Sequence, residues 1–316
     1  MTRSALLGWG LAAAGVAAIW ALALLGVPWV SPYYTDIVVR VGISLLAVMG
    51  LALVLGFTGQ FSLGHAGFMA VGAYGAGALA QTFGLPPVVS TLLGGCLAAV
   101  AGLAVGLPSL RLSGDYLAVV TLGFNGILLV LIQNSPALGG AQGMTGIPTL
   151  ETLETTGRAF GWTWTFVLLG GLGVRNLVNS PHGRAFKAVR DNEIATRSLG
   201  VDTTRVKVTA FVVGAFLAGI AGGLLAHSKS SIFPSMFQFD RSIELLAMVV
   251  LGGTGSLSGP LLAGAVLTAL PEILRPIAEY RMVIYALLLV GMMILRPAGL
   301  LGARELVDVV RRKRVA

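Results

Sequence analysis

The stretch VGISLLAVMGLALVLGFTGQFSLGHAGFMAVGAYGAGALA, Val41–Ala80, opens a run with no Asp, Glu, Lys or Arg that extends to Leu110. A helix needs about 20 apolar residues to cross the hydrocarbon core of a bilayer, so this run alone is long enough for three spans. One part of it, Gly56–Leu79, also contains seven glycines and the polar side chains of a Thr, a Gln, a Ser and a His. The stretch predicts packed membrane helices with a break in the helical backbone between or within them.

The composition of the whole chain supports a membrane protein. Of its 316 residues, 56% are hydrophobic and only 11% are charged, and the mean hydropathy is +0.88. Barrel strands would be about ten residues long with alternating polarity, whereas long apolar runs fit helices, which satisfy their own backbone hydrogen bonds in lipid. We therefore expect an all-α polytopic membrane protein that forms one permease domain over residues 1–316.

Apolar runs and the Gly, Pro and Ser breaks between them predict ten spans. The first run follows Arg3 like a signal peptide, but it exceeds the usual apolar length of 7–15 residues, so we interpret it as a span. Ten spans allow two halves of five, and an odd number per half inverts one half relative to the other. The expected spans are 5–27, 37–57, 64–83, 88–107, 114–133, 162–178, 207–226, 241–253, 258–274 and 281–296.

The basic residues orient these spans. With both termini inside, fifteen of the 21 Lys and Arg residues fall in inside segments, five fall in outside segments, and Arg40 lies within a span. Positive residues prefer the cytoplasmic side, so we expect both termini and the basic tail 297–316 in the cytoplasm. The net charge of +8 then reflects topology and an anionic inner leaflet rather than nucleic-acid binding. Segment 134–161 is expected outside, as a candidate surface for a periplasmic partner.

Cysteine and histidine usage excludes two kinds of site. The single cysteine, Cys96, allows no disulfide framework, and the three histidines have no ligand spacing. We expect no metal site and no catalytic residue in this chain.

Polar groups at membrane depth are the candidates for a translocation pathway, because they are costly in lipid and normally face the protein interior. The competing interpretation is that they form hydrogen bonds between helices, worth about 0.6 kcal/mol each on average. Gly72, Gly75 and Gly77 predict a small-residue face for close helix contact, and Arg241 and Glu244 are spaced to pair at the outer end of a span. The pathway candidates are Thr58, Gly59, Gln60, Ser62, Gly64, His65 and Asn125.

Residues 179–206 form the long polar segment on the inside. Ser180 and Pro181 suit a helix start and Gly200 suits a stop, and Asp202 can cap the next span. On one continuous helix, Ala185, Ala188, Val189, Ala195 and Leu199 would share an arc of about 120°. This predicts either an amphipathic surface helix or a docking element for a cytoplasmic protein. The docking candidates are Arg190, Asp191, Glu193, Ala195, Arg197 and Gly200.

Several segments resemble the branched-chain amino acid ABC permeases of the LivM type. Residues 184–211 resemble the coupling loop of that family, and TGQFSLGH at 58–65 resembles its Thr-Gly-x-x-Ser-Leu-Gly-His signature. Three further segments match in order, at 114–123, 143–148 and 251–256. The general importer motif Glu-Ala-Ala, three residues, Gly is altered here, because Ile194 replaces an Ala and Gly200 follows Glu193 by seven positions rather than six.

The resemblance implies a permease subunit of an importer in the inner membrane. Its expected partners are a second related permease in a heterodimeric pore, two cytoplasmic ATPase subunits and a periplasmic substrate-binding protein. The chain has no Gly-x-x-x-x-Gly-Lys-Ser/Thr phosphate loop, so we expect ATP and Mg to be used by the partners and no cofactor to be bound here. Related permeases carry urea or other small polar solutes, and an ion-coupled secondary transporter or a channel is a further alternative.

Overall fold

The computed structural model describes residues 14–26, 31–109, 115–150 and 157–274, together with 286–287, 290–291, 299–300 and 302. Residues 14–21 are helical and lead into η1 (Leu22–Gly26). The long helices are α2 (Pro32–Leu51), α3 (His65–Phe83), α4 (Pro87–Ser109), α5 (Asp115–Gln133), α6 (Arg158–Asn179), α9 (Thr203–Lys229), α10 (Phe239–Gly252) and α11 (Ser258–Ile273). The shorter elements are η3 (Ala52–Phe57), η4 (Pro136–Leu138), η5 (Gly140–Gln142), β1 (Met144–Thr145), α7 (Pro181–Asp191), α8 (Glu193–Ser198), β2 (Ser231–Ile232) and η6 (Pro234–Phe237).

The helices confirm the predicted fold class. Every expected span from the second to the ninth coincides with one long helix, with α2 continuing through η3. Among the described residues, four helical segments are long and apolar enough to cross a membrane: Pro32–Phe57, Pro87–Pro108, Tyr116–Gln133 and Thr203–Lys229. Most of the tenth span lies outside the described residues. The inverted relation of the two halves stays a prediction.

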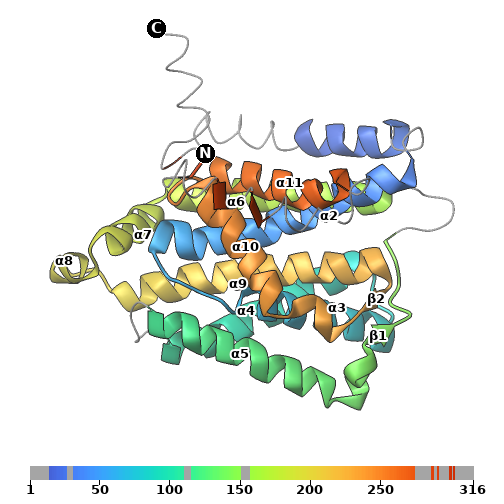
Figure 1. Cartoon of the computed structure of the whole chain (residues 1–316), viewed down its shortest axis with the longest axis horizontal. Helices are drawn as coiled ribbons and strands as arrows, with labels where there is room; N and C mark the ends of the chain where they lie inside the picture. Colours follow the sequence, from blue (N-terminus) through green and yellow to red (C-terminus); the bar gives the residue numbers. More distant parts are fainter. Residues whose placement is uncertain are drawn as a thin grey trace, which may run out of the picture.

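Helix α9 is the central element, and it packs on α4, α3 and α2 (Figure 1). Glycine permits the closest of these approaches: a Cβ added at Gly72 would overlap the backbone of Gly219, and one at Gly222 would overlap the backbone of Met69. Such small-residue contacts are a common way to pack membrane helices. The expected contact face is confirmed at Gly72, whereas Gly75 meets Leu97 and Gly77 meets Met144.

The two ends of the molecule carry different elements (Figure 1). Helices α7 and α8 lie at one end, and the antiparallel pair β1–β2 lies at the other, with Met144 opposite Ile232. Helix α9 connects the ends, because it starts just after α8 and stops just before β2. The arrangement agrees with the prediction that segments 134–161 and 179–206 lie on opposite sides.

One expectation about segment 179–206 was wrong. Pro181 does begin a helix and Asp202 does cap α9, accepting from the backbone N–H of Arg205 at 3.1 Å. However, the helix ends at Asp191, because Asn192 is extended (φ −160°) and its side chain caps the new helix α8 by accepting from Ala195. Gly183, Phe186 and Val189 therefore form the buried face of α7, and Leu199 does not share it.

Parts of two predicted peripheral segments lie outside the described residues. These parts are most of the basic tail 297–316 and residues 151–156 of segment 134–161. The described part of segment 134–161 contains η4, η5 and β1.

Candidate functional site: the glycine-rich break and the coupling segment

The backbone leaves the helical conformation between α2 and α3, at the predicted position. Helix α2 widens into the π turn η3, and residues 59–64 are non-helical before α3 begins at His65. Single π turns occur frequently at functional sites. Gly59 adopts a left-handed conformation (φ +70°), which costs other residues roughly 1–2 kcal/mol. Non-helical backbone at this depth is tolerated only against protein or a cavity. We call residues 56–64 the break.

Three polar side chains of the break and its surroundings carry buried atoms that have no described hydrogen-bond partner. Both amide atoms of Gln60, the hydroxyl of Ser62 and the carbonyl oxygen of Asn125 have no hydrogen-bond partner among the described residues. The Asn125 amide does donate to the Phe237 carbonyl, at 3.4 Å. A buried polar atom without a partner costs roughly 1–3 kcal/mol, so such groups need a reason. These three fit a pathway that a polar solute or water contacts.

Thr58 and His65, by contrast, are bonded within the protein. The Thr58 hydroxyl donates to the Val54 carbonyl at 2.6 Å, and His65 Nε2 lies 3.1 Å from the Ala47 carbonyl oxygen of α2. The His65 contact fits the competing interpretation, a hydrogen bond between helices, whereas the Thr58 bond lies within one helical segment. His65 thus fixes the start of α3 against α2.

Helix α5 forms one wall of the break. The Leu63 N–H donates to the Thr121 hydroxyl at 3.0 Å, and a Cβ at Gly64 would overlap the Thr121 carbonyl. Asn125 lies one turn further along α5, against Gly67 of α3. Gly64 and Asn125, which were predicted separately, thus belong to one helix contact.

Helix α7 forms the opposite wall. Arg190 donates from a guanidinium nitrogen to the Gly56 carbonyl at 3.0 Å, and the position of a Cβ on Gly59 lies 3.1 Å from Arg190 Cγ. Lys187 Nζ lies 5.9 Å from the centre of the Phe57 ring, within the range of a cation–π contact. The two groups of residues that the sequence singled out are therefore in direct contact.

We call residues 179–206 the coupling segment. A cavity of ≈ 280 Å³ lies between the break and this segment. Its lining includes Thr58, Gly59, Gln60 and Phe61 on one side and Arg190, Asp191, Asn192 and Glu193 on the other. Arg190 at the end of α7 and Gln60 of the break therefore line the same cavity.

The predicted docking residues divide into two groups. Arg190 and Glu193 engage this chain itself, because Arg190 reaches the break and Glu193 pairs with Lys207 of α9 at 2.6 Å. Asp191 pairs with Arg190 at 3.1 Å but is exposed, and Ala195, Arg197 and Gly200 are exposed as well. Ile194 and Leu199 are exposed as well, at 81% and 85%. In the sequence, Ile194 was noted only as a departure from the importer motif. A large apolar residue among charged ones also indicates a surface that a partner protein covers.

The polar side chains of the break are amides and hydroxyls, from Thr58, Gln60 and Ser62. None of the acidic side chains whose burial is described is buried, and the described residues contain no group of three His, Cys, Asp or Glu placed to hold a metal ion. Ion-coupled transporters use buried acidic residues for the coupling ion. The described part of the chain places the amide and hydroxyl groups of the break beside α7.

Comparison with known proteins identifies the family. Residues 33–295 match the model for the branched-chain amino acid transport system / permease component. The chain is 39% identical to the high-affinity branched-chain amino acid transport system permease protein LivM of Escherichia coli, over 89% of this chain and 73% of the relative. It is 26% identical to a probable LivM of Methanocaldococcus jannaschii over 69% of this chain and 70% of that one, and 32% identical to LivH of Escherichia coli over 48% and 49%.

No solved structure matches the chain. The family match covers both the break and the coupling segment, and the relatives are permease subunits of transporters. Together with the apolar helices, this makes the protein a multi-pass protein of the inner membrane. The chain belongs to the family of branched-chain amino acid transport permeases.

Proposed function

We propose that this chain is a transmembrane subunit of an ABC importer that moves branched-chain amino acids inward by alternating access. The observation that carries the mechanism is the contact between α7 and the break through Arg190 and Gly59. Movement of α7 by a cytoplasmic partner is thereby transmitted to backbone that lines the pathway. The family match supports the substrate class.

The proposed partners follow the architecture of such importers. A second related permease completes the pore, two ATPase subunits bind below it, and a periplasmic binding protein delivers the amino acid. The chain itself binds no cofactor, and ATP and Mg are used by the ATPases. Both termini lie in the cytoplasm, in agreement with the distribution of basic residues.

The exposed tip of α8 supports docking of the ATPase. Ile194 and Leu199 present large apolar side chains to solvent on a segment whose other exposed residues are polar or small. Exposed apolar residues rimmed by polar ones mark protein contacts. Glu193 pairs with Lys207 and thereby holds α8 against α9. A displacement of α8 by the ATPase is then transmitted to α9 as well as to the break.

Purification and uptake test the proposal together. The chain is tagged in its native operon, purified, and analysed for copurifying subunits, and uptake of labelled leucine is measured in cells that lack the chromosomal copy. We expect an ATPase to copurify and uptake to need both this chain and a hydrolysing ATPase. Normal leucine uptake with a catalytically dead ATPase would contradict the proposal, and uptake of urea instead of leucine would change its substrate.

A further inference from the structure

A second cavity, of ≈ 680 Å³, lies among α2, α9, α10 and α11. Its lining includes Lys229 at the end of α9 that precedes β2, so it opens at the end of the molecule opposite α7 and α8. In the predicted topology this is the outer side. None of the pathway residues predicted from the sequence lines it.

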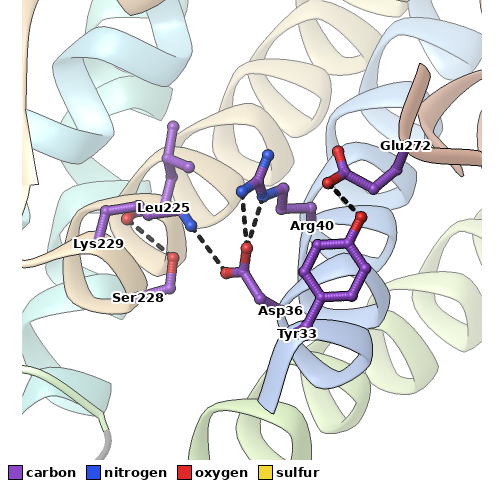
Figure 2. Close-up of polar contacts among 7 residues, drawn as sticks. All are labelled: Tyr33, Asp36, Arg40, Leu225, Ser228, Lys229 and Glu272. Atoms are coloured by element: carbon purple, nitrogen blue, oxygen red, sulfur yellow. Dashed lines mark hydrogen bonds and ion pairs between the residues drawn. The ribbon is translucent and has the colours of Figure 1, made fainter. Parts of the chain in front are cut away.

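Charges of both signs surround this outer cavity. Arg40, Lys229 and Arg241 line it together with Glu244 and Glu272, and Asp36 lies directly beside Arg40 and Lys229 (Figure 2). The three positive and three negative formal charges balance. Charged side chains within membrane helices are expensive and normally face a water-filled cavity or one another, and these side chains line a cavity and pair with one another.

Two cations share one carboxylate at one side of the cavity. Asp36 Oδ2 lies 2.7 Å from Arg40, and Asp36 Oδ1 lies 2.8 Å from Lys229 (Figure 2). One carboxylate neutralises only one of the two positive charges. The Arg40 side chain is also 49% exposed. The carboxylate that completes the formal balance, Glu272, accepts from the Tyr33 hydroxyl at 2.7 Å (Figure 2). Asp36 is the carboxylate that contacts both Arg40 and Lys229, so this side of the cavity favours a further carboxylate, which a ligand can supply.

A carboxylate stands on α10, on the other side of the cavity. Glu244 accepts from Arg241 at 2.7 Å, and Arg241 also donates to Ser44 at 3.0 Å. Arg241 is thereby held by α2 as well as by its own helix, while the Glu244 side chain stays 47% exposed. An exposed carboxylate that lines the cavity can accept hydrogen bonds from the ammonium group of a ligand.

Apolar side chains complete the lining of the cavity. Met248 of α10 and Leu267 of α11 are almost fully buried, and Ile43 of α2 is buried beside them. Ligand sites for small molecules are mostly apolar, with a few polar groups that fix the orientation. The lining thus combines a cationic side, an anionic group and an apolar floor.

We infer that the outer cavity is a low-affinity site for a zwitterionic apolar amino acid, with the carboxylate at Arg40 and Lys229, the ammonium group at Glu244 and the side chain on Met248 and Leu267. The inference rests on the proposed function and deepens it. It gives the amino acid a place on this chain after release from a binding protein. A free amino acid, rather than a protein segment, fits a cavity of ≈ 680 Å³ that is lined by charges of both signs.

Saturation-transfer NMR of L-leucine against the purified tagged assembly, without binding protein, tests the inference. Two analogues that each lack one charge serve as probes: 4-methylpentanoate, which has no ammonium group, and isoamylamine, which has no carboxylate. We expect saturable binding of leucine, and binding of each analogue weaker by roughly tenfold or more, because a bond to a charged group contributes that much.

The variants Arg40→Gln and Glu244→Gln assign the two sides. Arg40→Gln is expected to weaken the binding of leucine and of 4-methylpentanoate but not that of isoamylamine. Glu244→Gln is expected to weaken the binding of leucine and of isoamylamine but not that of 4-methylpentanoate. Arg205→Gln is the control. Arg205 pairs with Asp202 at the i,i+3 spacing of the Arg241–Glu244 pair, but it lies at the end of the molecule that carries α7 and α8. This variant should leave the binding of all three ligands unchanged.

Absence of saturable leucine binding to the wild-type assembly would overturn the inference, as would equal binding by both variants. Either result is compatible with leucine uptake that depends on this chain and on a hydrolysing ATPase. Failure of the outer site is therefore distinguishable from failure of the proposed function.

Discussion

At the residue scale, the candidate pathway depends on groups whose hydrogen-bonding capacity is not used within the described protein. Gln60 is the clearest example, because it is 4% exposed and neither of its amide atoms has a described partner. The sequence could single out Gln60 by its residue type and depth. It could not separate Gln60 from His65, because the difference between them is whether a carbonyl from another helix lies within reach.

Replacing Gln60 by the similarly shaped Met should stabilise the protein and impair transport. Removal of the buried amide eliminates an unpaired group that costs roughly 1–3 kcal/mol, so the apparent Tm in detergent should rise while leucine uptake falls. Gln81→Met is the control, because Gln81 is exposed and donates to the Thr145 carbonyl at 2.6 Å, and it should neither raise the Tm nor lower leucine uptake. A Gln60→Met variant with a lower Tm and normal uptake would show that Gln60 only packs.

Gly59 permits a comparison that isolates its contact with Arg190. Gly59→Ala and Gly84→Ala both place a side chain on a left-handed backbone (φ +70° and +63°), at a cost of roughly 1–2 kcal/mol each. Only Gly59 lies against a neighbour, since a Cβ at Gly84 meets nothing within 4 Å. We expect both variants to lower the Tm and only Gly59→Ala to reduce uptake strongly. Equal uptake by the two variants would argue against a role for this contact.

At the scale of elements, the apolar periodicity predicted the spans well because each helix is long and interrupted by Gly, Pro or Ser. Segment 179–206 was harder to predict. Its helix breaks at Asn192 because the Asn side chain caps α8 while the backbone is extended, and an Asn in a polar helix gives little warning of this. The contact of α7 with the break joins residues more than a hundred positions apart, and helical periodicity carries no information about such a contact.

The close approach of α3 and α9 predicts a large difference between two glycine substitutions. Gly72→Ala forces a methyl group into the backbone of Gly219, and overpacking of this kind costs about 1–3 kcal/mol. Gly173→Ala in α6 meets nothing within 4 Å and should be neutral or stabilising, since Ala suits a helix better than Gly by roughly 0.5–1 kcal/mol. The apparent Tm and the yield of assembled protein measure both effects. Equal Tm values would mean that α3 and α9 are not held at this distance.

At the scale of the whole molecule, the two ends should face opposite sides of the membrane. Cys96 is replaced by Ala, and single cysteines are introduced at the exposed positions Ser198 in α8 and Ser235 in η6. A membrane-impermeant thiol reagent added to intact spheroplasts should label Ser235→Cys, whereas labelling of Ser198→Cys should need lysed membranes. Labelling in the reverse order would show that the topology is opposite to the predicted one and that the outer cavity faces the cytoplasm.

The central claim is that movement of the coupling segment reaches the pathway through Arg190, and the most direct test is the number of leucine molecules transported per ATP hydrolysed. This ratio is measured in proteoliposomes for the wild type, for Arg190→Gln and for Arg184→Gln, which removes an exposed charge from the same helix. Loss of the charge-assisted bond to Gly56 should lower the ratio for Arg190→Gln by roughly tenfold or more while ATP hydrolysis continues. Arg184→Gln should keep the wild-type ratio, and a wild-type ratio for Arg190→Gln would contradict the account.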